Sequence, residues 1–375
     1  MAAPIPFIDL QAQRRRLGEP LNKAILEAVE GGAWIMGPQV AAFEKQLAEF
    51  VGVKHVVACA NGTDALILPL MAWGIGPGDA VFVPTFTFAA SAEVVALVGA
   101  SPVFVDVLED TYNMDPASLE AAIALVKREG KLKARAVMPV DLFGQPADYR
   151  AIEPIVRREG LKMLCDTAQA FGAKYQGRVT GSIGDAASTS FFPAKPLGCY
   201  GDGGAAFTND DGLADLLKSI RNHGAGADRY ENVRIGMNSR LDTIQAAILI
   251  EKLKIFPEEI ELREEVARRY NTGLGKSNRI RVPLVIADAQ STWAQYTIQV
   301  PNRDKLQADL KAKGIPTAVY YPIPLSAQKG YACYPSAPIP ASEKICKTVV
   351  ALPMHPYLDE RTQDSIIEAV LASVA

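Results

Sequence analysis

Seven short apolar segments, separated mostly by helical patterns, constrain the fold of this chain more than any other feature. They lie at 55–60, 80–83, 102–106, 136–140, 162–166, 187–191 and 204–208. Apolar strands that alternate with helices favour a mainly parallel sheet covered by helices on both faces. The sequence therefore predicts an α/β fold with a mainly parallel seven-stranded sheet.

From residue 242 onward the pattern changes to one long helix that reaches about residue 270, and Pro257 is expected to kink it. A helix of this length often joins two domains. The elements predicted after it are a strand at 293–300 and a helix at 303–313. We therefore expect a large domain at residues 1–250 and a smaller α/β domain at residues 251–375. The chain length of 375 residues suits two domains.

The composition argues against several classes of function. Lysine and arginine number 39 and aspartate and glutamate 42, which gives a net charge of −3. A protein that covers nucleic acid needs a basic face, so no nucleic-acid partner is expected. No stretch reaches the roughly 18 uncharged apolar residues of a membrane span, so no membrane partner is expected. The first ten residues lack the layout of a signal peptide.

The cysteines and histidines point to an intracellular protein without a metal. The five cysteines are odd in number and widely scattered, which indicates free thiols in a reducing cytoplasm. None of them forms a CxxC pair, and the chain has only three histidines. No metal site is therefore expected. His55 and His223 are interpreted as structural or hydrogen-bonding residues.

Polar residues follow three of the predicted strands, at the sheet edge where ligands of open parallel sheets bind. Gly62 and Thr63 open a helical run after the first strand, where free backbone N–H groups cradle a phosphate or are simply capped. Asp166 ends another apolar strand, where an unpaired carboxylate would be costly. Lys195 stands between a third strand and a glycine-rich loop, a position that suits a Schiff-base lysine or a surface residue.

Taken together, these three sites offer what a pyridoxal 5′-phosphate (PLP) enzyme needs. A carboxylate at Asp166 would keep the pyridine nitrogen protonated, so that the ring can absorb the electrons of a carbanion. Lys195 would hold the cofactor and then move a proton between Cα and C4′ as general base and acid. Phe88 is placed to stack on the ring face.

Several segments resemble motifs of the DegT/DnrJ/EryC1/StrS sugar aminotransferase family. They are FIDL at 7–10, ANGTDAL at 60–66, CDTAQ at 165–169, SFFPAKPLG at 190–198, GMNSRLD at 236–242 and YPIPL at 321–325. The resemblance covers nearly the whole chain. It implies the PLP-dependent aminotransferase fold type I, with two active sites at the interface of a homodimer and pyridoxamine 5′-phosphate as an intermediate form of the cofactor.

Within that family, the stretches 190–211 and 240–249 are especially similar to the WbpE type. Such enzymes transfer the amino group of L-glutamate to the C3 ketone of a UDP-2-acetamido-2-deoxy-hexuluronic acid. The resemblance therefore implies release of 2-oxoglutarate and formation of a 3-amino nucleotide sugar for surface polysaccharide (O-antigen) biosynthesis.

The resemblance also assigns the site residues. Lys195 would be the catalytic residue, Gln169 would sit by the cofactor's 3-hydroxyl, and Asn238 would reach the phosphate from the other subunit. The residues implied to bind the cofactor are Gly62, Thr63, Phe88, Asp166, Gln169, Ser190, Lys195 and Asn238. The residues implied to bind the sugar substrate are Gly32, Trp34, Arg240, Tyr320 and Tyr321.

Arg240 is the natural partner for a uronic carboxylate, because a guanidinium group pairs with a carboxylate bidentately. Ala194, Tyr320 and Trp34 depart from the residues usual in the family, and all three are on the substrate side. The alternatives are therefore another 3- or 4-keto sugar linked to dTDP or GDP, or a cyclitol. A PLP-dependent sugar dehydratase would have histidine in place of Lys195. A non-catalytic regulatory protein on the same fold is the alternative of another class.

Overall fold

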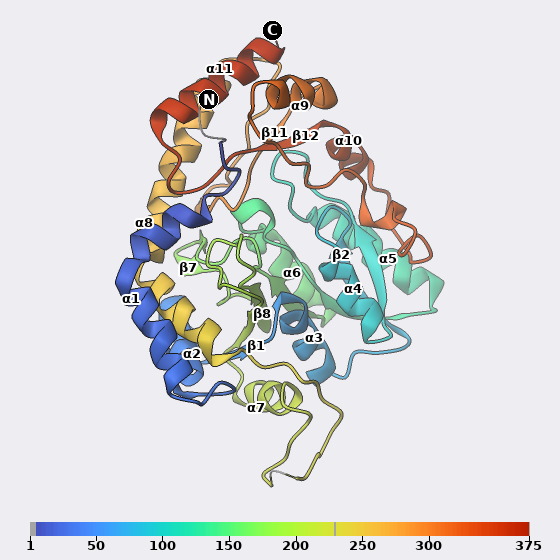
Figure 1. Ribbon diagram of the computed structural model, residues 1–375. Coiled ribbons are helices and arrows are strands. Elements are labelled where there is room, and N and C mark those ends of the chain that lie inside the picture. The colour runs from blue at the N-terminus through green and yellow to red at the C-terminus, as the bar shows by residue number, and fades with distance from the viewer. Residues whose placement is uncertain (1–4, 229, 375) are drawn as a thin grey trace.

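The computed structural model describes residues 5–228 and 230–374, and its centre is a seven-stranded sheet (Figure 1). The strand order is β1-β9-β8-β5-β4-β2-β3. The strands are β1 (His55–Cys59), β2 (Asp79–Pro84), β3 (Ser101–Val105), β4 (Lys133–Val137), β5 (Lys162–Asp166), β8 (Ala186–Ser190) and β9 (Gly204–Thr208). Only β9 runs antiparallel to its neighbours, β1 and β8. The seven predicted strands are confirmed, with small shifts of their ends.

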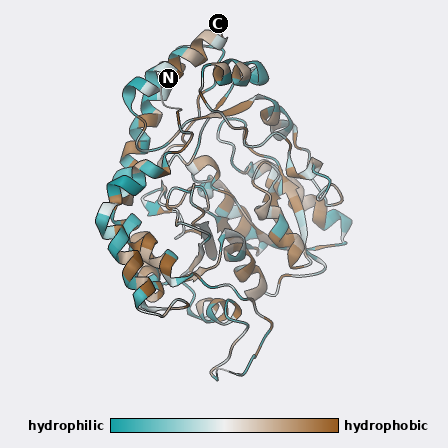
Figure 2. Ribbon diagram, viewed as in Figure 1, coloured by the Kyte–Doolittle hydropathy of each residue, from teal (hydrophilic) through white to brown (hydrophobic). Residues whose placement is uncertain are grey.

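Two apolar cores cover the two faces of this sheet. Along β1, Val56 and Ala58 face one core, whereas Val57 and Cys59 face the other. The first core packs against α2 (Pro38–Val51), α5 (Pro116–Glu129), α6 (Tyr149–Glu159) and the start of α8. The second packs against α3 (Gly62–Ala72), α4 (Ala90–Leu97) and α7 (Asp211–Ile220). Figure 2 shows more hydrophilic residues on the outer helices than on those beside the sheet.

Helix α8 (Thr243–Leu274) is the predicted long helix, and it includes Pro257 as a single element. Its first half packs Ile248 against Leu17 and Leu21 of α1 (Leu10–Glu30). Its last turns join a third core, formed with β11 (Tyr296–Gln299), β12 (Val349–Leu352), α9 (Arg303–Ala312) and α11 (Glu360–Val374). This smaller unit lies at the top of Figure 1. The helix therefore contributes to both units, and residue 250 falls inside it.

The remaining elements are short connections around these units. They are η1 (Leu142–Gly144), β6 (Lys174–Tyr175), β7 (Arg178–Val179), β10 (Ala289–Gln290), η2 (Leu325–Ala327) and α10 (Pro340–Thr348). Strand β10 pairs with β6 and so ties the chain beyond α8 back to the large unit. No helix within residues 5–228 and 230–374 is long and apolar enough to cross a membrane.

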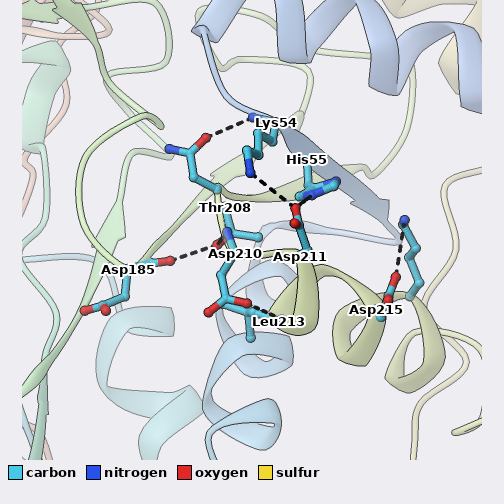
Figure 3. Close-up of polar contacts among 10 residues, drawn as sticks. Lys54, His55, Asp185, Thr208, Asp210, Asp211, Leu213 and Asp215 are labelled. Carbon is cyan, nitrogen blue, oxygen red and sulfur yellow. Dashed lines mark hydrogen bonds and ion pairs between the residues drawn. The ribbon is translucent and has the colours of Figure 1, made fainter.

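A polar cluster joins the amino-terminal end of β1 to the first turn of α7 (Figure 3). Asp210 Oδ1 accepts the backbone N–H of Leu213 at 2.9 Å and so caps this helix. His55 Nε2 lies 2.7 Å from Asp211 Oδ1, and this hydrogen bond, together with the charge of Lys54, lowers the pKa of Asp211. His55 is thus a hydrogen-bonding residue, as predicted, and it lies at the sheet edge opposite the residues that follow the strands.

Candidate active site

A narrow cradle forms where the carboxyl end of β8 meets the start of α3. Asn61 Oδ1 accepts the N–H of Asp64 at 2.8 Å and caps α3, which leaves the N–H groups of Gly62 and Thr63 without partners in the helix. A Cβ on Gly62 would lie 2.5 Å from Ser190 Cβ and 2.9 Å from Ser190 Oγ, so only glycine allows this close approach. Free N–H groups, a helix N-terminus and a hydroxyl are a donor set that fits a phosphate.

Asp166 ends β5 and is 5% exposed. Its Oδ1 accepts the backbone N–H of Ala168 at 3.1 Å, and its Oδ2 accepts the Oγ–H of Ser91 at 2.9 Å. Burial raises the pKa of this carboxyl, whereas the two hydrogen bonds and the charge of Lys195 act in the opposite direction. The carboxylate therefore suits a cationic partner such as a protonated ring nitrogen.

Lys195 follows β8 and is partly exposed. Its backbone N–H donates to the carbonyl of Phe192 at 2.8 Å, which forms a tight turn directly after the strand. The dense packing around the amine lowers the pKa of Lys195, and the charge of Asp166 opposes this effect. A lowered pKa increases the neutral fraction of the amine, and the neutral amine is the form that attacks a carbonyl carbon.

The glycine-rich loop after Lys195 is held by α8. Lys252, 1% exposed, donates from its Nζ to the carbonyl of Gly198 at 2.6 Å. The same ammonium lies 4.3 Å from the centre of the Tyr200 ring, and Gln245 Oε1 accepts the backbone N–H of Tyr200 at 2.9 Å. Burial lowers the pKa of Lys252 to about 8. This contact was not predicted from the sequence, although a lysine on the apolar side of a predicted helix was a usable signal.

Gln169, Tyr321 and Phe88 are also brought together. Gln169 Nε2 donates to the Tyr321 hydroxyl at 3.1 Å, and Gln169 Oε1 accepts the backbone N–H of Phe143 at 2.9 Å. The ring centres of Phe88 and Tyr321 are 6.4 Å apart, and Phe88 is 57% exposed, so its ring is accessible to a ligand. The Tyr320 ring centre lies 5.8 Å from that of Tyr321. Burial raises the pKa of the Tyr321 phenol.

The remaining predicted substrate residues form a second group on the surface. Trp34, 56% exposed, accepts the N–H of Thr243 through its carbonyl at 2.9 Å, so the segment that follows Gly32 lies against the start of α8. Arg240 donates from Nη2 to the exposed Asn238 Oδ1 at 2.5 Å. Within the described residues, no hydrogen bond joins Asn238 or Arg240 to Lys195. The segment between α7 and α8 projects from the body of the molecule (Figure 1).

The second group nevertheless approaches the end of β1. Ser239 Oγ accepts the backbone N–H of Ala60 at 3.3 Å, and the backbone N–H of Ser239 donates to the carbonyl of Arg221 at 2.9 Å. Arg221 is itself buried and donates from Nη1 to Glu44 Oε1 at 2.5 Å. The side chains of Asn238 and Arg240 are thus carried by a backbone that is anchored beside the cradle.

The residues present fit PLP. The Gly62 cradle offers donors for a phosphate, the buried Asp166 suits a ring nitrogen, and Lys195 offers an amine of lowered pKa. All three lie at the carboxyl ends of β1, β5 and β8. The fold and this site together define a PLP-dependent enzyme of fold type I.

Comparisons with known proteins give the family. The model of the DegT/DnrJ/EryC1/StrS aminotransferase family matches residues 15–371. The chain is 49% identical to the UDP-2-acetamido-2-deoxy-3-oxo-D-glucuronate aminotransferase of Pseudomonas aeruginosa. The match extends over 355 residues, which are 95% of this chain and 96% of the relative. The chain belongs to the DegT/DnrJ/EryC1/StrS aminotransferase family.

Solved structures agree with this assignment. A DegT DnrJ EryC1 StrS aminotransferase from Brucella abortus is 55% identical, with a TM-score of 0.97 over 99% of this chain and 100% of that chain. NtdA from Bacillus subtilis, solved with bound pyridoxamine phosphate, is 29% identical, with a TM-score of 0.88 over 100% of this chain and 86% of that chain. The protein is a PLP-dependent aminotransferase, and the cofactor alternates between its pyridoxal and pyridoxamine forms.

Proposed function

We propose that this aminotransferase moves the amino group of L-glutamate to the C3 ketone of a UDP-2-acetamido-2-deoxy-hexuluronic acid. The products are 2-oxoglutarate and a 3-amino nucleotide sugar for surface polysaccharide (O-antigen) biosynthesis in the cytoplasm. The observation that carries the transaminase chemistry is the meeting of Lys195, Asp166 and the Gly62 cradle at one sheet edge. The choice of sugar is supported by the Pseudomonas relative, whose named substrate is of this kind.

Each residue of the first group has a defined task in this proposal. When bound, PLP supplies an electron sink for the carbanion that forms at the carbon bearing the nitrogen. Gly62, Thr63 and Ser190 hold the phosphate through two backbone N–H groups and one hydroxyl. Asp166 holds a proton on the ring nitrogen. Lys195 Nζ would bond to the cofactor and, once displaced, would take the proton from the substrate Cα and deliver it to C4′ of the cofactor.

The surrounding side chains orient the cofactor and the sugar. Gln169 contacts the 3-hydroxyl of the cofactor and is itself fixed by its bonds to Phe143 and Tyr321. Phe88 stacks on the ring. Tyr320 and Tyr321 contact the sugar from the same side.

The second group completes the site in a homodimer. Asn238 and Trp34 are exposed and Arg240 is partly exposed in a single chain, which supports a position at an interface. In this arrangement Asn238 reaches the phosphate in the neighbouring subunit. Gly32 and Trp34 contact the sugar, and Arg240 pairs with its carboxylate bidentately.

Two substrates that differ only at C6 test the choice of sugar. We expect kcat/KM for the 3-keto uronate to exceed that for the matching 6-hydroxymethyl sugar. Replacing Arg240→Met should lower kcat/KM roughly 10- to 100-fold for the uronate alone, since a bidentate bond to a charge is lost. Equal rates on both substrates in the wild type would favour another 3- or 4-keto sugar. Failure to accept any amino donor, combined with specific DNA binding, would favour the regulatory alternative.

A further inference from the structure

Ser91 is a buried hydroxyl bonded directly to Asp166. It lies in α4, is 0% exposed, and donates to Asp166 Oδ2 at 2.9 Å. Thr87 Oγ1 lies 3.2 Å from Ser91 Oγ, so the two hydroxyls and the carboxylate form a chain. Thr87 is also buried, at 2% exposed. Neither residue belongs to the sets that the family resemblance assigns.

The surroundings of Asp166 make this bond important. Burial favours the neutral carboxyl, and each hydrogen bond donated to the carboxylate favours the charged form. Only two donors to this carboxylate are seen among the described residues, namely the backbone N–H of Ala168 and the hydroxyl of Ser91. The backbone donor is present whatever the sequence. The Ser91 hydroxyl is therefore the donor to Asp166 that comes from a side chain and that a mutation can remove.

We propose that Ser91 is a positioning residue that keeps Asp166 ionised and aimed at the ring nitrogen of the cofactor. The inference rests on the proposed role of Asp166. The same short segment also carries Phe88, which lies between Thr87 and Ser91 in the sequence. The segment from Thr87 to Ser91 thus positions the carboxylate that faces the ring nitrogen and also carries the aromatic ring proposed to stack on the cofactor.

A second serine provides a matched control. Ser188 on β8 is the strand partner of Asp166 and is 1% exposed. Its Oγ has no hydrogen-bond partner among the described residues. Ser188→Ala therefore removes a buried hydroxyl one strand away from Asp166 without removing a bond, whereas Ser91→Ala removes one.

The experiment compares the affinity of the cofactor-free protein for PLP and for 1-deaza-PLP, which has carbon in place of the ring nitrogen. The readout is the ratio of the two Kd values, measured by absorption titration. Wild type should prefer PLP, because only PLP offers the nitrogen to Asp166. Ser91→Ala should reduce this preference about tenfold, the effect of losing one hydrogen bond to a charged group. Ser188→Ala should leave it unchanged.

The outcomes separate the inference from the function on which it rests. A general loss of packing weakens both ligands alike and leaves the ratio at its wild-type value. If Asp166→Asn abolishes the preference but Ser91→Ala retains it, the role of Ser91 is refuted. If wild type itself shows no preference, the proposed role of Asp166 fails first. Thr87→Val is a second variant, expected to reduce the ratio by a smaller factor of about two to three, because it acts only through Ser91.

Discussion

Replacing Gly62→Ala should close the phosphate cradle. The new Cβ would lie 2.5 Å from Ser190 Cβ and 3.1 Å from Ser190 Cα, far inside the roughly 3.5–4 Å at which carbon atoms pack. Because one of these atoms is backbone, rotating the serine side chain cannot relieve the overlap. The start of α3 or the end of β8 must therefore move by about 1 Å.

The sign of the change in stability distinguishes a closed cradle from an ordinary effect of helix propensity. Alanine in place of glycine in a helix usually stabilises it by up to about 1 kcal/mol. Overpacking a close contact costs about 1–3 kcal/mol, so we expect a net loss of stability in Gly62→Ala. The shifted donors should also weaken PLP binding at least about tenfold, because the phosphate then loses one charge-assisted hydrogen bond.

Two assays measure these effects, namely urea unfolding of the cofactor-free protein and absorption titration with PLP. Gly76→Ala is the matched control, because its Cβ would meet its nearest atom, the carbonyl oxygen of Val98, at 3.6 Å. The double variant Gly62→Ala/Ser190→Gly should regain only part of the lost stability, because the approach to the Cα of residue 190 at 3.1 Å remains, and it should still bind PLP weakly because the hydroxyl is gone. An alanine at position 62 that stabilises the protein and leaves PLP affinity intact would refute the cradle.

Three further outcomes are expected. Lys252→Met should remove the bond to the glycine-rich loop and lower kcat several-fold, whereas Lys254→Met, on the exposed side of the same helix, should not. Because the pKa of Lys252 falls from 10.5 to about 8 on folding, the unfolding free energy of wild type relative to Lys252→Met should increase as the pH is raised from about 8 to 10.5. Burial lowers the pKa of His355 from 6.5 to about 4, so wild type should lose up to about 3 kcal/mol as pH falls through that window, a slope that His355→Gln should lack in urea unfolding. Tyr321→Phe should leave the Gln169 amide without its partner and reduce kcat/KM for the keto sugar about 5- to 30-fold, with a smaller effect on the glutamate half-reaction; equal losses in both half-reactions would contradict the proposed sugar contact.

The sheet was predictable because its strands are apolar runs bounded by polar residues. Buried parallel strands such as β2, in which every residue is buried, leave this signal whatever they pack against. The cofactor was predictable for a related reason, since Asp166 and Lys195 are charged residues that interrupt apolar patterns at strand ends. The structural relatives confirm the cofactor, and the roles of the individual side chains remain predictions.

Contacts between distant segments were not predictable. The approach of Gly62 to Ser190 depends on where β8 ends relative to α3, which no local pattern encodes. The place of Lys252 on the apolar side of a predicted helix is a signal of burial, but its bond to the Gly198 carbonyl depends on how the glycine-rich loop packs against that helix. Ser91 interrupts an apolar helix, but only the tertiary fold shows that its hydroxyl meets Asp166.

The most direct test of the central claim is an absorption titration of the purified enzyme with L-glutamate. We expect the visible band of the lysine-bound cofactor to bleach to the pyridoxamine form and to return when 2-oxoglutarate is added. Lys195→Ala should show no such cycle. A cofactor band that ignores glutamate would contradict the proposed donor. Absence of any cofactor band after incubation with PLP would contradict the site itself.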